Sequence, residues 1–172
     1  MKRIIFLLTA LVVLTTSTAY AAKLGIREIE LGMGKQQAME LLNKHPGIKC
    51  ISNSCREEAE IIRPAKFFYM FGSENGKLNS IGIEFDDSHF DAMLQGMIDK
   101  YGKETEIQHG IWQSKGGVKL NNSVYVWILI DGQMKASKIG NKMGVSSIIM
   151  LGNDYLEEMR LRKMKDKQLP GF

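Results

Sequence analysis

The clearest pattern in the chain is a run of apolar residues at helical spacing near its middle. The apolar positions recur at i, i+3, i+4, i+7, i+8 and i+11, and they are Phe90, Met93, Leu94, Met97, Ile98 and Tyr101. Such spacing places one apolar stripe along an α-helix. Asp87 or Ser88 is the expected N-terminal cap and Gly102 the expected end of this helix. The pattern therefore predicts an amphipathic helix that covers a core.

Alternation of apolar and polar residues predicts strands on both sides of this helix. Ile81, Ile83 and Phe85 alternate with Gly82 and Glu84, so one face of that strand is expected to be buried. An Asn-Gly turn precedes it, which favours a hairpin because both residues accept positive φ. Strands are predicted over 59–63, 67–71, 78–85, 111–113, 118–120, 123–131 and 146–151, helices over 35–45 and 154–167, and a loop over 132–144.

The order of these elements repeats along the chain. A helix followed by three strands spans 31–85, and a looser version of the same unit spans 88–151. A helix followed by an antiparallel meander is a self-contained α+β unit, and two such units can share one sheet. The sequence thus predicts an α+β fold with an antiparallel sheet, helices mainly on one face, two related helix-then-meander modules, and a terminal helix over 154–167.

The first 22 residues have the pattern of a secretory signal peptide. A positive start at Lys2-Arg3 precedes an apolar run over 4–13, and small residues at A-x-A spacing end at Ala21-Ala22. The run is shorter than the roughly 20 residues that span a bilayer. We therefore expect residues 1–22 to be removed near Ala21-Ala22. Residues 23–172 would then form a single α+β domain, periplasmic or secreted, without a transmembrane span.

Composition and charge narrow the classes of partner. The formal net charge is +4, and because Lys2 and Arg3 carry two of these charges, the mature chain would carry about +2. This value is too small to indicate binding to nucleic acid. The two cysteines, Cys50 and Cys55, favour a disulfide in an oxidising compartment. Alternatives are a redox pair or half a metal site, but the four-residue spacing is not that of a thioredoxin-like motif, and no second Cys or His pair completes a zinc site.

Short motifs carry a resemblance to known exported modules. They are the segment Leu31-Gly32-Met33-Gly34-Lys35 with its helix, the hairpin Asn75-Gly76-Lys77-Leu78, and the ending Lys100-Tyr101-Gly102-Lys103 of the middle helix. These resemble exported tandem helix-helix-strand-strand-strand modules of unknown function. The same architecture occurs in the beta-lactamase inhibitory protein and in the small lipoprotein subunit of the outer-membrane barrel assembly machine. The resemblance implies a fold and a general binding role. It covers most of 32–151, but the chain lacks the lipidated Cys of the second group.

No set of residues points to catalysis or to a bound metal. His45, His89 and His109 have no second ligand at helical spacing and are interpreted as surface residues. A weak metal site of His89 with nearby acids is the alternative. Glu57, Glu58 and Glu60 are expected on a solvated edge beside the disulfide.

The acids before and within the middle helix have two interpretations. Asp86, Asp87 and Asp91 could act as paired carboxylates in acid–base chemistry. Stabilisation of the positive end of the helix dipole explains them more simply. We therefore predict no cofactor and no metal.

Aromatic residues on the strands provide the strongest candidates for binding. Residues 124–130 are expected to present two different strand faces. The face expected to lie under the helices is aliphatic, with Val124, Val126, Ile128 and Ile130. The other face carries Tyr125, Trp127 and Leu129. Tyr and Trp are enriched at binding hot spots. The alternative is that both faces are buried, by the terminal helix or by a second copy. The predicted binding residues on the open face are Tyr69, Trp112, Tyr125 and Trp127.

These features lead to one functional hypothesis and two alternatives. The hypothesis is a periplasmic, non-catalytic protein-binding or inhibitor-like module whose partner is a protein of the cell envelope. The first alternative is a structural accessory of the envelope that makes contact through a sheet edge or the basic terminal helix. The second is an unrecognised envelope hydrolase.

Overall fold

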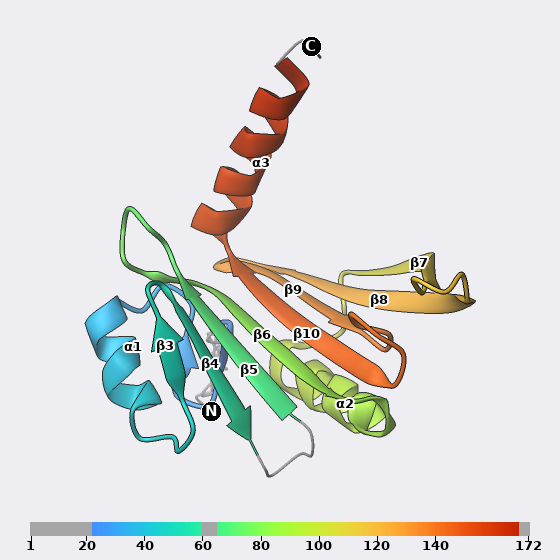
Figure 1. Cartoon of the computed structure of the whole chain (residues 1–172), viewed down its shortest axis with the longest axis horizontal. Coiled ribbons are helices and arrows are strands. Elements are labelled where there is room, and N and C mark those ends of the chain that lie inside the picture. Colours follow the sequence, from blue (N-terminus) through green and yellow to red (C-terminus); the bar gives the residue numbers. More distant parts are fainter. Residues whose placement is uncertain (1–21, 60–64, 169–172) are drawn as a thin grey trace, which may run out of the picture.

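One antiparallel sheet of eight strands forms the body of the molecule (Figure 1). The computed structural model describes residues 22–59 and 65–168, so the predicted signal peptide before Ala22 and most of the predicted strand over 59–63 lie outside the described residues. A two-stranded hairpin and three α-helices complete the described part, which is α+β as predicted. In chain order the elements are β1 (Gly25–Ile26), β2 (Ile29–Glu30), α1 (Lys35–Leu42), β3 (Lys49–Ile51), β4 (Ser54–Ala59), β5 (Ala65–Phe71), β6 (Leu78–Asp86), a 3-10 turn (Asp87–His89), α2 (Phe90–Tyr101), β7 (Glu106–Gln113), β8 (Lys119–Leu129), β9 (Gly132–Ser137), β10 (Val145–Gly152) and α3 (Asn153–Gln168).

The strand order has a mirror-like arrangement about its centre. It runs β3-β4-β5-β6-β10-β9-β8-β7, so each half is one helix followed by a meander of four strands, and β6 pairs with β10 in the middle. The first half thus has one strand more than the three predicted, whereas in the second half the predicted strands over 118–120 and 123–131 form one strand, β8, and β9 is additional. The predicted loop over 132–144 is wrong in its first part, because Gly132–Ser137 forms β9. The buried positions of β9 are Gly132, Met134 and Ala136. Because only Met134 among them is a large apolar residue, the segment has no strong apolar alternation.

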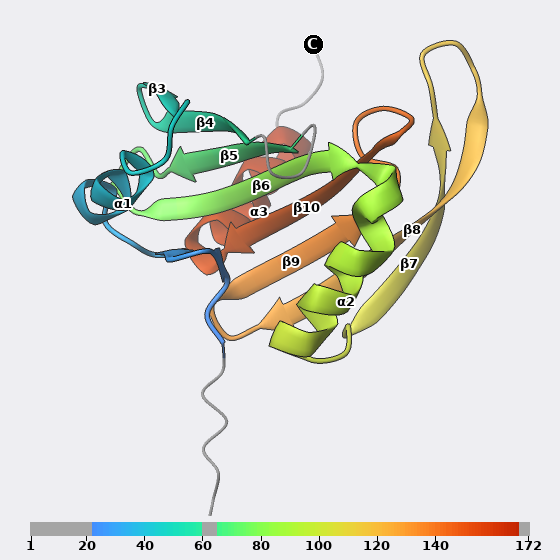
Figure 2. The same cartoon turned by 90° about the horizontal axis from the view of Figure 1, so that it is seen from below.

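The core lies on one face of the sheet. Ala38 and Leu42 of α1 and Phe90 of α2 join one buried cluster with strand residues such as Tyr69 and Phe85. Figure 2 shows α2 in front of the sheet and α3 behind it. The helices α1 and α2 therefore cover the same face, and the opposite face is left without them.

The ends of α2 follow from local chemistry. Its C-terminal residue is followed by Gly102, which has a φ of 82° that glycine adopts without strain. The cap before the preceding turn is Asp86, not Asp87 or Ser88 as predicted, and its Oδ1 accepts the Ser88 backbone N–H at 3.0 Å. Hydrogen bonds from Ser88 hold the pKa of Asp86 below its usual value. This supports the structural interpretation of the acids at this helix start.

The terminal helix α3 leaves the body of the protein at the end of β10 (Figure 1). Ion pairs Glu157–Arg160 and Glu158–Arg162 lie along its surface. Met159 and Met164 on the same helix are exposed. Among the helices of the described residues, none has the length and apolar character needed to cross a bilayer.

The two cysteines are linked across the first two strands of the sheet. The Sγ atoms of Cys50 and Cys55 lie 2.04 Å apart, and the two residues are directly paired between β3 and β4. This confirms the predicted disulfide. Met39 of α1 packs its sulfur 3.6 Å from Cys55 Sγ. The disulfide therefore fixes the edge of the sheet beneath α1.

The expectation of a solvated edge at Glu57 is wrong. Its side chain is 4% exposed and lies 3.0 Å from Arg27 Nη1. The Arg27 guanidinium also lies 4.9 Å from the centre of the Phe67 ring. A buried carboxylate is tolerated where a cation compensates for its lost hydration. Glu57 is thus part of the core that joins the N-terminal hairpin to β4.

Candidate functional site

Two of the four predicted binding residues are buried on the helix-covered face. Tyr69 is 0% and Trp127 is 1% exposed. Trp127 pairs with Met134 across β8 and β9, and its Nε1 donates a hydrogen bond to the Gly102 carbonyl at 2.8 Å. The prediction that Trp127 and Tyr69 lie on the open face is therefore wrong. For Trp127 the physical reason is that Gly102, just after α2, supplies a hydrogen-bond acceptor for the buried indole. Tyr69 lies in the same core, near Glu57 and Arg27.

The other two predicted residues are half-buried and lie apart from each other. Tyr125 also faces the core, where its ring centre is 5.9 Å from that of Phe90. This placement contradicts the expected open-face position of Tyr125. Trp112 lies near the end of β7, where it pairs with Leu120. The structure does not bring the four predicted residues together on one surface.

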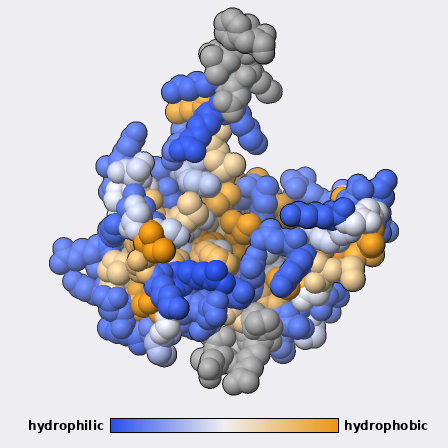
Figure 3. Space-filling view, in the orientation of Figure 1, coloured by the Kyte–Doolittle hydropathy of each residue, from blue (hydrophilic) through white to orange (hydrophobic). Residues whose placement is uncertain are grey.

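The open face carries aliphatic residues in their place. Strand register aligns Arg56, Phe68, Gly82, Ile149 and Lys135 in one row across the central strands. Ile149 is 43% exposed, and in the neighbouring row Met70 is 44% and Ile128 61% exposed. Figure 3 shows orange and tan residues gathered near the base of α3, among hydrophilic ones. The predicted aliphatic face of β8 thus belongs to the open side of the sheet.

A shallow hollow of about 260 Å³ lies in the middle of this face, lined by residues including Phe68, Met70, Gly82, Glu84 and Ile149. It exists because Gly82 has no side chain between Phe68 and Ile149. A Cβ added at Gly82 would lie 3.6 Å from Phe68, which is ordinary van der Waals contact. The backbone there would therefore accept a side chain that fills the hollow. We call this surface, formed by Phe68, Met70, Gly82 and Ile149, the open-face hollow.

The β7–β8 hairpin forms an arm at one end of the sheet (Figure 2). Residues 119–123 of β8 pair only with β7, because β9 pairs with 124–129. Ile111 and Val118 on this arm are 69% and 51% exposed. Among the strands of the described residues, β7 is the last in the sheet, so none of them pairs with the outer edge of the arm.

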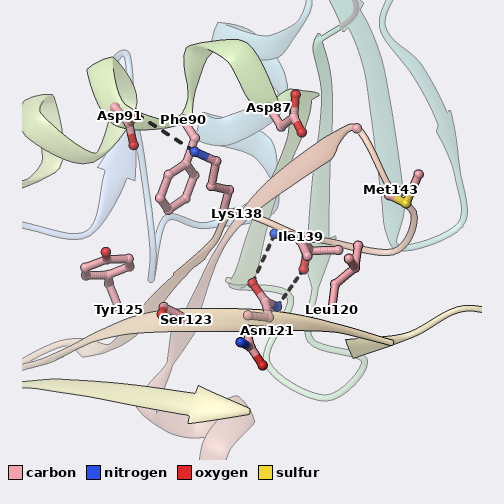
Figure 4. A pocket seen from close by; sticks show the side chains of 12 residues that line it. Asp87, Phe90, Asp91, Leu120, Asn121, Ser123, Tyr125, Lys138, Ile139 and Met143 are labelled. Carbon is pink, nitrogen blue, oxygen red and sulfur yellow. Dashed lines mark hydrogen bonds and ion pairs between the residues drawn. The ribbon is translucent and has the colours of Figure 1, made fainter. Parts of the chain in front are cut away.

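A second pocket, of about 440 Å³, lies at the base of this arm (Figure 4). Phe90 and Tyr125 form its apolar wall, and Asp91 and Lys138 approach each other to 3.9 Å at its mouth. Asn122 holds the adjoining connection by donating to the Ile139 carbonyl at 2.9 Å. The pocket therefore offers an aromatic surface with exposed charges of both signs, which suits contact with a polar group.

Two of the three histidines lie beside polar side chains. No group of three or more His, Cys, Asp or Glu among the described residues is close enough to hold a metal ion. His45 Nδ1 lies 2.9 Å from Arg27, and His109 Nδ1 lies 3.1 Å from Ser123 Oγ. Both histidines therefore have structural partners.

Sequence reasoning missed the open-face hollow although two signals for it were present. A glycine inside a strand pattern often marks a place where something else approaches the backbone closely. Gly82 stands in such a position between Ile81 and Ile83. The alternation of Phe68 and Met70 with the buried Tyr69 also defines a second apolar face. Neither signal predicts that β5, β6 and β10 are neighbours in the sheet, and the hollow forms only because they are.

Comparison of the chain with protein-family models, with curated proteins and with solved structures found no match.

Proposed function

We propose that this chain is an exported, non-catalytic protein-binding module that docks its partner on the open-face hollow. The observation that carries this proposal is the exposure of Met70 and Ile149 beside a hollow on a sheet face that neither α1 nor α2 covers. Large apolar side chains gathered on one surface mark interaction sites more often than scattered ones do.

The shape and surroundings of the hollow favour a protein over a small molecule. Its volume of about 260 Å³ lies below the usual range of ligand pockets, which begins at roughly 300 Å³. Arg56, Glu84 and Lys135 surround the apolar centre on neighbouring strand positions. An apolar centre with a polar rim is the usual anatomy of a protein interface. A partner that inserts one aliphatic or aromatic side chain at Gly82 would fit this surface.

Export is supported by the N-terminal pattern and by the disulfide. The Lys2-Arg3 start and the apolar run that follows are typical of a signal peptide. A disulfide between Cys50 and Cys55 persists in the periplasm or outside the cell, whereas cytosolic thiols are kept reduced. The partner is accordingly expected in the cell envelope or outside it.

The test uses photo-crosslinking in living cells. A photoreactive amino acid is placed at Met70, beside the hollow, and in a second strain at Ile111, on the exposed arm. Crosslinked products are identified by mass spectrometry. We expect one dominant protein from position 70 and none, or a different one, from position 111. The same product from both positions, or none from position 70, would contradict docking at the hollow.

A substitution that fills the hollow provides the matching binding test. Gly82→Val adds a side chain whose Cβ would contact Phe68, and Gly110→Val adds the same side chain at a position of β7 where a Cβ would meet nothing within 4 Å. Both variants are expected to fold. Gly82→Val should lower the affinity for the crosslinked partner at least tenfold, whereas Gly110→Val should leave it unchanged. Equal affinities of the two variants for the partner would show that the interface does not include the open-face hollow.

A further inference from the structure

A polar cavity of about 220 Å³ lies where the central strands meet the start of α3. On the covered face, Ile81, Met150 and Met134 form a packed row across β6, β10 and β9. At the end of the same strands, Gly152 pairs with Gly132, so that position of the layer has no side chain. Gly132 has no room for one, because a Cβ there would lie 2.1 Å from the Leu151 carbonyl oxygen. The cavity is thus built into the strand pairing.

Two oxygen atoms of residues that line this cavity are buried and have no hydrogen-bond partner among residues 22–59 and 65–168. One is Oδ1 of Asn79, a residue that is 9% exposed, and the other is Oδ1 of Asp131. The second oxygen of Asp131 accepts the Leu24 backbone N–H at 2.6 Å. A buried acceptor without a partner destabilises the fold, and a charged one does so more strongly. Two such acceptors in one cavity indicate that a ligand with positive charge or donor groups belongs there.

The other groups around the cavity define the chemistry of that ligand. Asp154, in the first turn of α3, brings a second carboxylate, and its Oδ2 accepts the Asn75 side-chain amide at 3.0 Å. Lys77 is the cationic side chain among the lining residues. Carboxylate and amide oxygens are the ligands that Ca²⁺ takes, at flexible geometry and with water completing its shell.

We propose that this cavity binds one Ca²⁺ ion. Asp131 Oδ1 and Asn79 Oδ1 are its inner ligands, and Asp154 contributes from the mouth. With two carboxylates and one amide, the site matches the weaker class of extracellular calcium sites, whose dissociation constants are about 0.1–1 mM. The ion would join β6, the turn before β9 and the start of α3, and would thereby fix the direction in which α3 leaves the sheet.

The direct test is calcium binding by the chain without its signal peptide, freed of metal with EDTA. Isothermal titration should show one site per chain for CaCl₂ and weaker binding for MgCl₂. Thermal unfolding followed by circular dichroism should give a Tm about 3–6 °C higher when Ca²⁺ is present at ten times its Kd. Absence of both heat and Tm shift up to 10 mM CaCl₂ would overturn the proposal.

Three variants locate the site. Asp131→Asn keeps an acceptor for Leu24 and replaces the carboxylate by a neutral amide, so it should fold at least as well in EDTA yet lose at least tenfold in calcium affinity. Asp91→Asn, a control on the far end of α2 with an exposed carboxylate, should bind like the original. Lys77→Gln removes the nearby positive charge and should bind calcium several-fold more tightly.

The same variants test the simplest competing explanation. If the Lys77 ammonium itself turns inward and pairs with Asp131, Lys77→Gln would lower the Tm in EDTA and calcium would have no effect on the unaltered chain. That result, or a calcium response that Asp131→Asn retains in full, would overturn the proposed site.

Discussion

Replacement of Trp127 separates a structural role from a binding role. Its side chain is 1% exposed, and its indole N–H bonds the Gly102 carbonyl at the end of α2. Truncation of a buried Trp to Ala costs about 3–5 kcal/mol through lost burial and the cavity left behind. The hydrogen bond adds little to this cost, because Gly102 is exposed and its carbonyl can bind water instead. We expect Trp127→Ala to lower the free energy of unfolding by about 4 kcal/mol.

That loss is large for a domain of this size. Domains are stable by roughly 5–15 kcal/mol in total, and 1 kcal/mol corresponds to about 2–4 °C in Tm for a chain of 150–250 residues. The Tm should therefore fall by about 8–16 °C. Trp127→Phe retains most of the ring volume and should lose only about 1–2 kcal/mol.

Urea unfolding followed by circular dichroism at 222 nm measures these losses. Trp112 provides the matched control, since it is the other tryptophan and is half-buried on β7, so Trp112→Ala should cost about 1 kcal/mol or less. Partner binding by Trp127→Phe should be unchanged. A Trp127→Ala variant whose Tm lies within 2 °C of the original, or a Trp112→Ala variant that is the less stable of the two, would refute this account of the core.

Three further predictions concern the N-terminal half. Glu57→Gln leaves Arg27 without its buried counter-charge and should lower the free energy of unfolding by about 2–4 kcal/mol in urea titrations, with Glu58→Gln as an exposed control. Burial and the nearby Glu57 carboxylate raise the pKa of Tyr69 above its ordinary value of 10.0. As the pH rises, the unfolded chain therefore loses the Tyr69 hydroxyl proton before the folded chain does, and the free energy of unfolding should fall above pH 10. Tyr69→Phe should reduce this fall, which urea midpoints measured from pH 8 to 11 would show. Replacing both Cys50 and Cys55 with Ser should cost about 2 kcal/mol by the loop-entropy estimate, and an unchanged Tm would argue against it.

The parts of the fold that the sequence predicts well are those set by local periodicity. The apolar stripe of the middle helix gives α2 at residues 90–101, and the terminal helix is predicted within one residue at each end. The Asn75-Gly76 turn likewise joins β5 to β6. In these segments the residues of one helix or turn carry the whole pattern, so the element can be predicted without knowing which distant segments it contacts.

The parts that sequence reasoning placed wrongly depend on contacts between distant segments. Alternation in β8 separates Tyr125 and Trp127 from the aliphatic residues, but it does not state which face meets the helices. The deciding partners are Phe90, the first residue of α2, and Gly102, which follows its last residue. The inward position of Glu57 likewise depends on a residue 30 positions away in the sequence. Burial of such groups is a tertiary property that no local window contains.

The open-face hollow and the polar cavity both lie where a glycine leaves a gap between paired central strands, at Gly82 and at Gly132. The two glycines differ in whether the fold has room for a side chain there. At Gly132 the Leu151 carbonyl lies where a Cβ would be, so glycine is needed for the strands to pair. At Gly82 the space is open, with Phe68 at contact distance. Because glycine in a strand costs about 0.5–1 kcal/mol relative to alanine, Gly82→Ala should raise the free energy of unfolding by about that amount, whereas Gly132→Ala should lower it. A glycine that folding does not need, in the centre of an exposed apolar face, is best explained by what the empty space admits. If Gly82→Ala instead destabilised the fold, the hollow would be a requirement of packing, and the argument for a docking surface would lose its strongest support.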